Sequence, residues 1–124
     1  MPDLNYLLLA VKDPRRSAEL YDQLFGVKPV ENAATFVLYV LPTGLKVGLW
    51  AAAGMKPVPR PAGGVELSFS LPDEKGVRET YAAWTKLGLE VIQAPTQMDF
   101  GFTFVVADPD GHRLRPFVLA ADPR

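Results

Sequence analysis

The chain has 124 residues, of which 48% are hydrophobic and 22% charged, as is typical of one globular domain. Thirteen basic and 14 acidic residues give a net charge of −1, and the basic residues are scattered, so no nucleic-acid partner is indicated. The lack of cysteine excludes disulfides and thiolate metal sites. The N-terminal apolar run is too short for a signal peptide or a membrane span, so we expect a cytoplasmic protein that does not contact membranes.

The first half of the chain predicts a strand, a helix and a pair of strands. Residues 4–11 form an apolar run of strand length. Asp13 and Pro14 then supply a helix N-cap and a first helical residue, and Gly26 supplies a helix stop. Residues 35–50 predict two strands joined by the turn-forming segment LPTG.

The second half repeats this order. Residues 64–71 alternate as a strand does, Pro72-Asp73 opens a helix that we expect to end at Gly88, and residues 102–117 predict strand, turn and strand. A connector rich in proline and glycine, residues 52–63, separates the halves. The sequence therefore predicts two βαβββ modules, residues 3–51 and 64–120, within a single domain of residues 1–124.

Several segments carry a resemblance to a known family. The duplicated unit, with VKD before the first helix, LYDQLFGVKPV at its end and DPDGHRLR before the last strand, resembles the vicinal oxygen chelate superfamily of glyoxalases, extradiol dioxygenases and bleomycin-type resistance proteins. The segments FVLYVLPTGLKVGLW, AWTK, GGVELSFSLP and DFGFTFVVADPDGHRLR are most similar to phenazine-antibiotic resistance proteins. The resemblance implies an α+β fold in which the two modules form a curved mixed sheet, and it implies a homodimer.

The resemblance also provides a test for a metal site. Metal-using members take one ligand from the first strand and one from the last strand of each half, and these positions correspond to Tyr6, Gly48–Trp50, Glu66 and Arg115. Only Glu66 is a suitable ligand, and an arginine would repel a divalent ion. We therefore expect no metal and no other cofactor, and we do not expect the superfamily's metal-dependent chemistry.

The segment DPDGHRLRPF holds the only histidine of the chain, together with two aspartates and two arginines. His112 could act as a general base or ligand, or it could simply begin a strand after a turn. We favour the second interpretation, because strand alternation puts His112 on the face opposite Arg115. Asp108 and Asp110 are interpreted as turn formers rather than a catalytic pair.

Alternation in residues 64–71 places Glu66, Ser68 and Ser70 on one face, which we expect to be the concave one. We hypothesise that Arg115 pairs with Glu66 there, the alternative being two separately solvated charges. Most strand aromatics are expected in the core, but by resemblance Trp50 aligns with a tryptophan suited to stacking on a flat aromatic ligand. The predicted ligand-binding residues are Trp50, Glu66, Arg115, Tyr6, Ser68, Met55 and, from a loop at residues 96–101, Asp99 and Phe100.

Two functional classes compete on these observations. The first is a metal-independent protein that sequesters planar aromatic or antibiotic-like small molecules and catalyses nothing. The alternative is a lyase, isomerase or dioxygenase of the same superfamily, with an atypical metal or with Glu66 as its base. A degenerate relative with only an interaction role is a third possibility.

Overall fold

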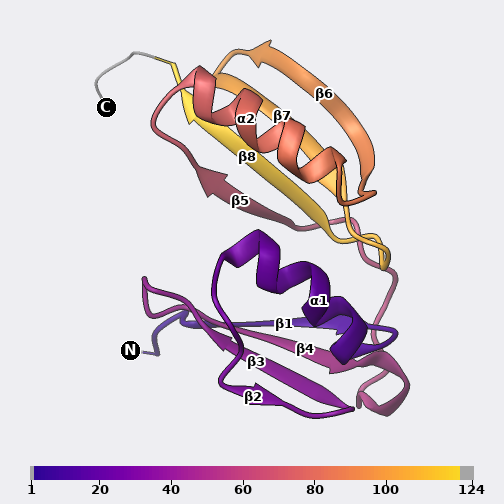
Figure 1. Ribbon diagram of the computed structural model, residues 1–124. Helices are drawn as coiled ribbons and strands as arrows, with labels where there is room; N and C mark the ends of the chain where they lie inside the picture. Colours follow the sequence, from indigo (N-terminus) through magenta and orange to yellow (C-terminus); the bar gives the residue numbers. More distant parts are fainter. Residues whose placement is uncertain (1, 121–124) are drawn as a thin grey trace. The chain divides into compact units, whose positions relative to one another are not determined.

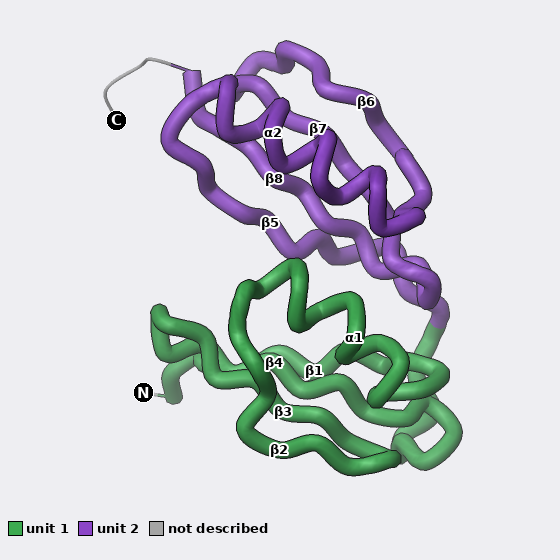
Figure 2. The backbone as a smooth tube through the Cα atoms, in the orientation of Figure 1, with its two compact units in different colours: residues 1–60 green, residues 61–124 purple. Residues whose placement is uncertain are grey.

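Each half of the chain builds one four-stranded mixed sheet with one helix packed on it (Figure 1). The computed structural model describes residues 2–120 and separates into two units, residues 1–60 and 61–124 (Figure 2). The first unit contains β1 (Tyr6–Val11), α1 (Pro14–Phe25), β2 (Glu31–Asn32), β3 (Phe36–Val40), β4 (Lys46–Ala51) and a short 3-10 turn (Ala52–Gly54). The second contains β5 (Glu66–Ser70), α2 (Glu74–Thr85), β6 (Glu90–Met98), β7 (Gly101–Ala107) and β8 (Arg113–Leu119).

The first sheet has the order β1-β4-β3-β2, with β1 parallel to β4 and the other pairs antiparallel. Alternate residues of its three longer strands face α1 and are buried: Leu9, Val11, Val37, Tyr39, Val47 and Leu49. The Tyr39 hydroxyl donates to Asp22 Oδ1 on α1 at 2.7 Å, so the polar atom of this buried side chain is satisfied. Within residues 2–60, no helix packs on the opposite face of the sheet.

The second sheet repeats this arrangement in the order β5-β8-β7-β6, with β5 parallel to β8. On its helix-covered face, Trp84 of α2 packs edge-on against Phe69 and Phe104. The open face carries Glu66, Arg113, Arg115 and Thr103. The two mixed sheets, each with one helix, confirm the predicted α+β fold class. In each sheet the strand residues that face the helix must be apolar, whereas those on the open face need not be.

The helix starts confirm the local sequence signals. Asp13 caps α1 by accepting from the Arg16 backbone N–H, and Asp73 caps α2 by accepting from Gly76 N–H at 2.7 Å. Gly26 ends α1 in the left-handed region with φ of 70°. Both helices have 12 residues, and no helix within residues 2–120 is long and apolar enough to cross a membrane.

Several predicted boundaries are wrong. The first strand begins at Tyr6 rather than residue 4, β5 spans Glu66–Ser70 rather than residues 64–71, and α2 ends at Thr85, three residues before Gly88. The predicted loop at residues 96–101 is mostly strand, since β6 continues to Met98 and β7 begins at Gly101. The strand was missed because it is an exposed edge strand with irregular register, so its side chains do not alternate between apolar and polar.

Gly101 fixes the tight connection between β6 and β7. Its φ is 153°, and a Cβ at this position would overlap the carbonyl oxygen of Val118 on β8. We expect Gly101→Ala to lower the free energy of unfolding by about 3 kcal/mol, through backbone strain and overpacking together. Gly54→Ala is the matched control, because nothing lies within 4 Å of its Cβ position. Urea unfolding of both variants measures the difference, and equal small effects would contradict this role of Gly101.

Candidate functional site

The open face of the first sheet carries an apolar pocket that we call the aromatic pocket. Its lining residues are Tyr6, Leu8, Phe36 and Trp50, from the three neighbouring strands β1, β3 and β4. The pocket is open to one side and has a volume of about 490 Å³, within the range of small-molecule sites. Tyr6 and Leu8 remain 40% and 48% exposed, so apolar surface is available to a ligand.

A right-angled pair of rings forms one corner of this pocket. Phe36 and Trp50 are cross-strand partners whose ring centroids lie 6.5 Å apart with planes at 88°. The Phe36 ring lies directly over Gly48, where an added Cβ would come within 2.9 Å of Phe36 and Leu8 side-chain atoms. Gly48 therefore lets the ring lie flat on the sheet, and the space that a side chain would occupy is taken by Phe36.

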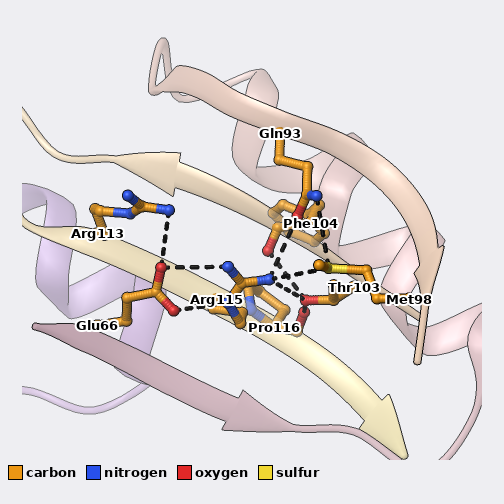
Figure 3. Close-up of polar contacts among 8 residues, drawn as sticks. All are labelled: Glu66, Gln93, Met98, Thr103, Phe104, Arg113, Arg115 and Pro116. Atoms are coloured by element: carbon orange, nitrogen blue, oxygen red, sulfur yellow. Dashed lines mark hydrogen bonds and ion pairs between the residues drawn. The ribbon is translucent and has the colours of Figure 1, made fainter. Parts of the chain in front are cut away.

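The open face of the second sheet is polar and holds what we call the charged cluster, Glu66, Arg113 and Arg115 (Figure 3). Arg115 Nε donates to Glu66 Oε1 at 2.7 Å, and Nη2 of the same guanidinium donates to Oε2 at 3.3 Å. Arg113 Nη2 lies 2.9 Å from Oε2. The predicted pairing of Arg115 with Glu66 is confirmed, and it is a two-point contact between neighbouring parallel strands.

The remaining nitrogen of Arg115 is held from the other side. Its Nη1 lies 3.3 Å from Gln93 Oε1 on β6 and 3.4 Å from Thr103 Oγ1 on β7. Thr103 in turn donates to the Pro116 carbonyl at 2.8 Å, which leaves its oxygen to accept from the arginine. The partners of Arg115 thus come from β5, β6 and β7, and their side chains surround the guanidinium (Figure 3). Arg115 is therefore anchored at all three of its guanidinium nitrogens.

Glu66 is poorly suited to act as a base. The hydrogen bonds from Arg115 hold the pKa of the Glu66 carboxyl below its ordinary value of 4.5, and the charges of Arg115 and Arg113 act in the same direction, against a smaller opposing effect of burial. A carboxylate with a lowered pKa accepts protons less readily. The environment of Glu66 therefore opposes its use for proton abstraction.

The charged cluster does not fit the divalent metal of the superfamily. Both Glu66 oxygens accept from arginines, so the one suitable ligand is already engaged. Arg115 places a permanent cation where another ligand would be needed. In the first unit, Tyr6 occupies another of the superfamily's ligand positions, and its side chain lines the aromatic pocket. Within residues 2–120, no group of three or more His, Asp or Glu side chains is placed to hold an ion.

The turn before β8 is structural. Asp108 is 5% exposed, and its Oδ1 accepts from the backbone N–H groups of Asp110 and His112 at 2.9 and 2.8 Å. This confirms the interpretation of Asp108 as a turn former. Arg113, directly after the turn, is the first residue of β8.

The other predicted site residues are spread over both units. Ser68 is exposed on the face of the charged cluster, and Phe100 lies 6.0 Å from the Arg115 guanidinium carbon. Asp99 is exposed in the turn after β6, and Met55 follows the 3-10 turn without lining the aromatic pocket that residues 2–120 form. Five residues that line the aromatic pocket or contact the charged cluster were not predicted from the sequence: Leu8, Gln93, Met98, Thr103 and Arg113. Alternation in residues 6–11 could have placed Leu8 beside Tyr6, but β6 gave no comparable signal.

We expect the Glu66–Arg115 contact to be energetically coupled. Alanine substitutions made singly and together should give non-additive losses in unfolding free energy, with a coupling of about 1–2 kcal/mol. Glu74 and Arg78 on α2 are the control pair, since they form an ion pair with side chains 55% and 59% exposed and should couple by less than about 0.5 kcal/mol. Denaturant unfolding of both cycles measures the terms, and additive losses for Glu66 and Arg115 would contradict the contact.

Comparisons with known proteins agree with this architecture. The phenazine antibiotic resistance protein EhpR of Enterobacter agglomerans is 30% identical over 114 residues, which cover 90% of this chain and 88% of that protein. The solution NMR structure of an Agrobacterium tumefaciens protein, 41% identical, has a TM-score of 0.90 and covers 98% of this chain and 100% of that one.

At lower identity, a glyoxalase-related enzyme from Fulvimarina pelagi, 21% identical, shares the fold with a TM-score of 0.84, over 100% of this chain and 96% of that one. The family model of the glyoxalase/bleomycin resistance protein/dioxygenase superfamily matches residues 3–115. The chain belongs to that superfamily.

Proposed function

We propose that this protein binds planar aromatic small molecules of the antibiotic type and sequesters them without a metal and without chemical change. The observation that carries the proposal is the open aromatic pocket, with Trp50 and Phe36 at a right angle. A planar ring can stack on one of these side chains while its edge meets the other, as aromatic pairs prefer. The 30% identity with a phenazine resistance protein supports the same class of ligand.

Sequestration requires only a favourable free energy of binding, and the exposed apolar surface of the aromatic pocket can provide it. A flat tricyclic ligand would cover the exposed apolar surface of Tyr6 and Leu8, which contributes about 25 cal/mol for each Å² removed from water. The three strands that supply the pocket are paired over most of their length, so the rings are largely ordered before a ligand arrives. By contrast, the enzymatic alternative with Glu66 as base is disfavoured by the lowered pKa of that carboxyl.

The tryptophans allow a direct test, because the chain has only two. Trp84→Phe leaves Trp50 as the sole tryptophan, and Trp50→Phe leaves Trp84, which is 7% exposed in the core of the second unit. We expect phenazine to quench Trp50 strongly and Trp84 little, and we expect Trp50→Ala to weaken phenazine binding about tenfold because stacking area is lost. Fluorescence titration and calorimetry measure these effects. Equal quenching of both tryptophans would place the ligand elsewhere.

Metal independence is tested separately. We expect purified and dialysed protein to carry far less than one equivalent of Zn, Ni, Fe or Mn, since the four superfamily positions provide only Glu66 and that carboxylate is engaged by arginines. Phenazine affinity should be the same before and after treatment with EDTA. Elemental analysis by plasma mass spectrometry provides the measurement, and a stoichiometric metal that survives dialysis would overturn this part of the proposal.

A further inference from the structure

The charged cluster contains one more cation than anion. Its single carboxylate, Glu66, accepts two hydrogen bonds from Arg115 and forms an ion pair with Arg113. One positive charge therefore has no counter-ion inside the cluster. The Arg113 and Glu66 side chains are 34% and 28% exposed, so this charge lies at a surface that a small molecule can reach.

The two arginines are held very differently. Arg115 is 17% exposed and has partners at all three nitrogens, from Glu66, Gln93 and Thr103. Arg113 contacts Glu66 through Nη2, while its Nε is buried and has no hydrogen-bond partner within the described part of the chain. A buried guanidinium N–H without an acceptor is unfavourable, and an acceptor brought by a ligand would relieve it.

We propose that Arg113 binds a carboxylate group of a small-molecule ligand, and that Arg115 and Glu66 act as positioning residues for it. A carboxylate suits the site because it is planar, carries the missing negative charge and accepts two parallel N–H bonds from one guanidinium. Glu66 already makes this two-point contact with Arg115 on the same sheet face. The carboxylate site lies within the second unit, and it does not depend on the aromatic pocket of the first unit.

Arg113 must turn to use its buried Nε, and its surroundings permit this. Its side chain is one-third exposed, and among residues 2–120 it forms one ion pair, with Glu66. The separate contact between Glu66 and Arg115 does not involve Arg113 and stays intact when Arg113 moves. The incoming carboxylate then replaces Glu66 as the partner of Arg113, and Glu66 remains neutralised by Arg115. The charge of the occupied cluster is balanced, with two cations and two anions.

The experiment compares phenazine with phenazine-1-carboxylate and uses two independent reporters. Fluorescence of Trp50 in the Trp84→Phe background reports on the aromatic pocket, and the NMR signal of the Arg113 Nε–H reports on the charged cluster. We expect phenazine-1-carboxylate, and not phenazine, to shift the Arg113 signal, because only the carboxylate offers an anionic acceptor to the guanidinium. Benzoate should shift that signal as well, whereas benzamide and inorganic phosphate should not.

The variants isolate Arg113. Arg113→Gln should abolish benzoate binding measured by calorimetry, and Arg113→Lys should keep part of that binding because it keeps the charge. Arg78→Gln is the matched control, since it removes the same charge from an exposed ion pair on α2 of the same unit. The unfolding midpoint of each variant shows whether a loss of ligand binding is caused by a loss of folding.

The outcomes separate this inference from the proposed function. If both compounds quench Trp50 with equal affinity and the Arg113 signal does not move, the carboxylate site is wrong and the aromatic function stands. If the carboxylates move the Arg113 signal while Trp50 is unaffected, the carboxylate site stands and the aromatic function is wrong. A shift of similar size with phosphate would also overturn selectivity for a carboxylate.

Discussion

The contact between Glu66 and Arg115 determines the character of the whole second sheet. It joins the neighbouring parallel strands β5 and β8 through two hydrogen bonds, and Arg115 extends the connection to β6 and β7. Bringing two charges to a half-buried face costs desolvation, and this is offset only when the geometry satisfies most of their hydrogen bonds. Here the arginine meets that condition, so the open face of the sheet can remain polar without being unstable.

The two units share one connectivity but present opposite chemistry on their open faces. In both, the face beneath the helix is apolar because it forms the core, and this requirement determines half of the strand residues. The other half is unconstrained by helix packing. In the first unit these positions hold Trp50, Phe36 and Tyr6, and in the second they hold Glu66 and two arginines. The two units therefore share a scaffold while their open faces differ.

Sequence signals that act locally predicted their elements well. The caps Asp13 and Asp73 depend only on backbone groups within one turn, and the pairing of Glu66 with Arg115 follows from alternation in two strands. The partners from β6 were not predictable in this way. Gln93 and Met98 lie on an irregular edge strand that is exposed on both sides, so neither propensity nor periodicity identifies it. The position of the Phe36 ring was also not predictable from local sequence, because it depends on Gly48 of the neighbouring strand, whose missing side chain leaves space for the ring.

The two open faces differ in what they can contribute to recognition. An aromatic wall binds many flat molecules with similar strength, because a methylene more or less changes the free energy of binding by only about 1–3 kcal/mol. A guanidinium with a buried, unpartnered N–H is more discriminating, since a ligand without an acceptor leaves that group unpaired. Trp50 and Phe36 are therefore suited to binding flat compounds as a class, and Arg113 is suited to recognising ligands that carry an acceptor. Arg115 neutralises Glu66 through a two-point contact, so the charge of Arg113 is left for a ligand.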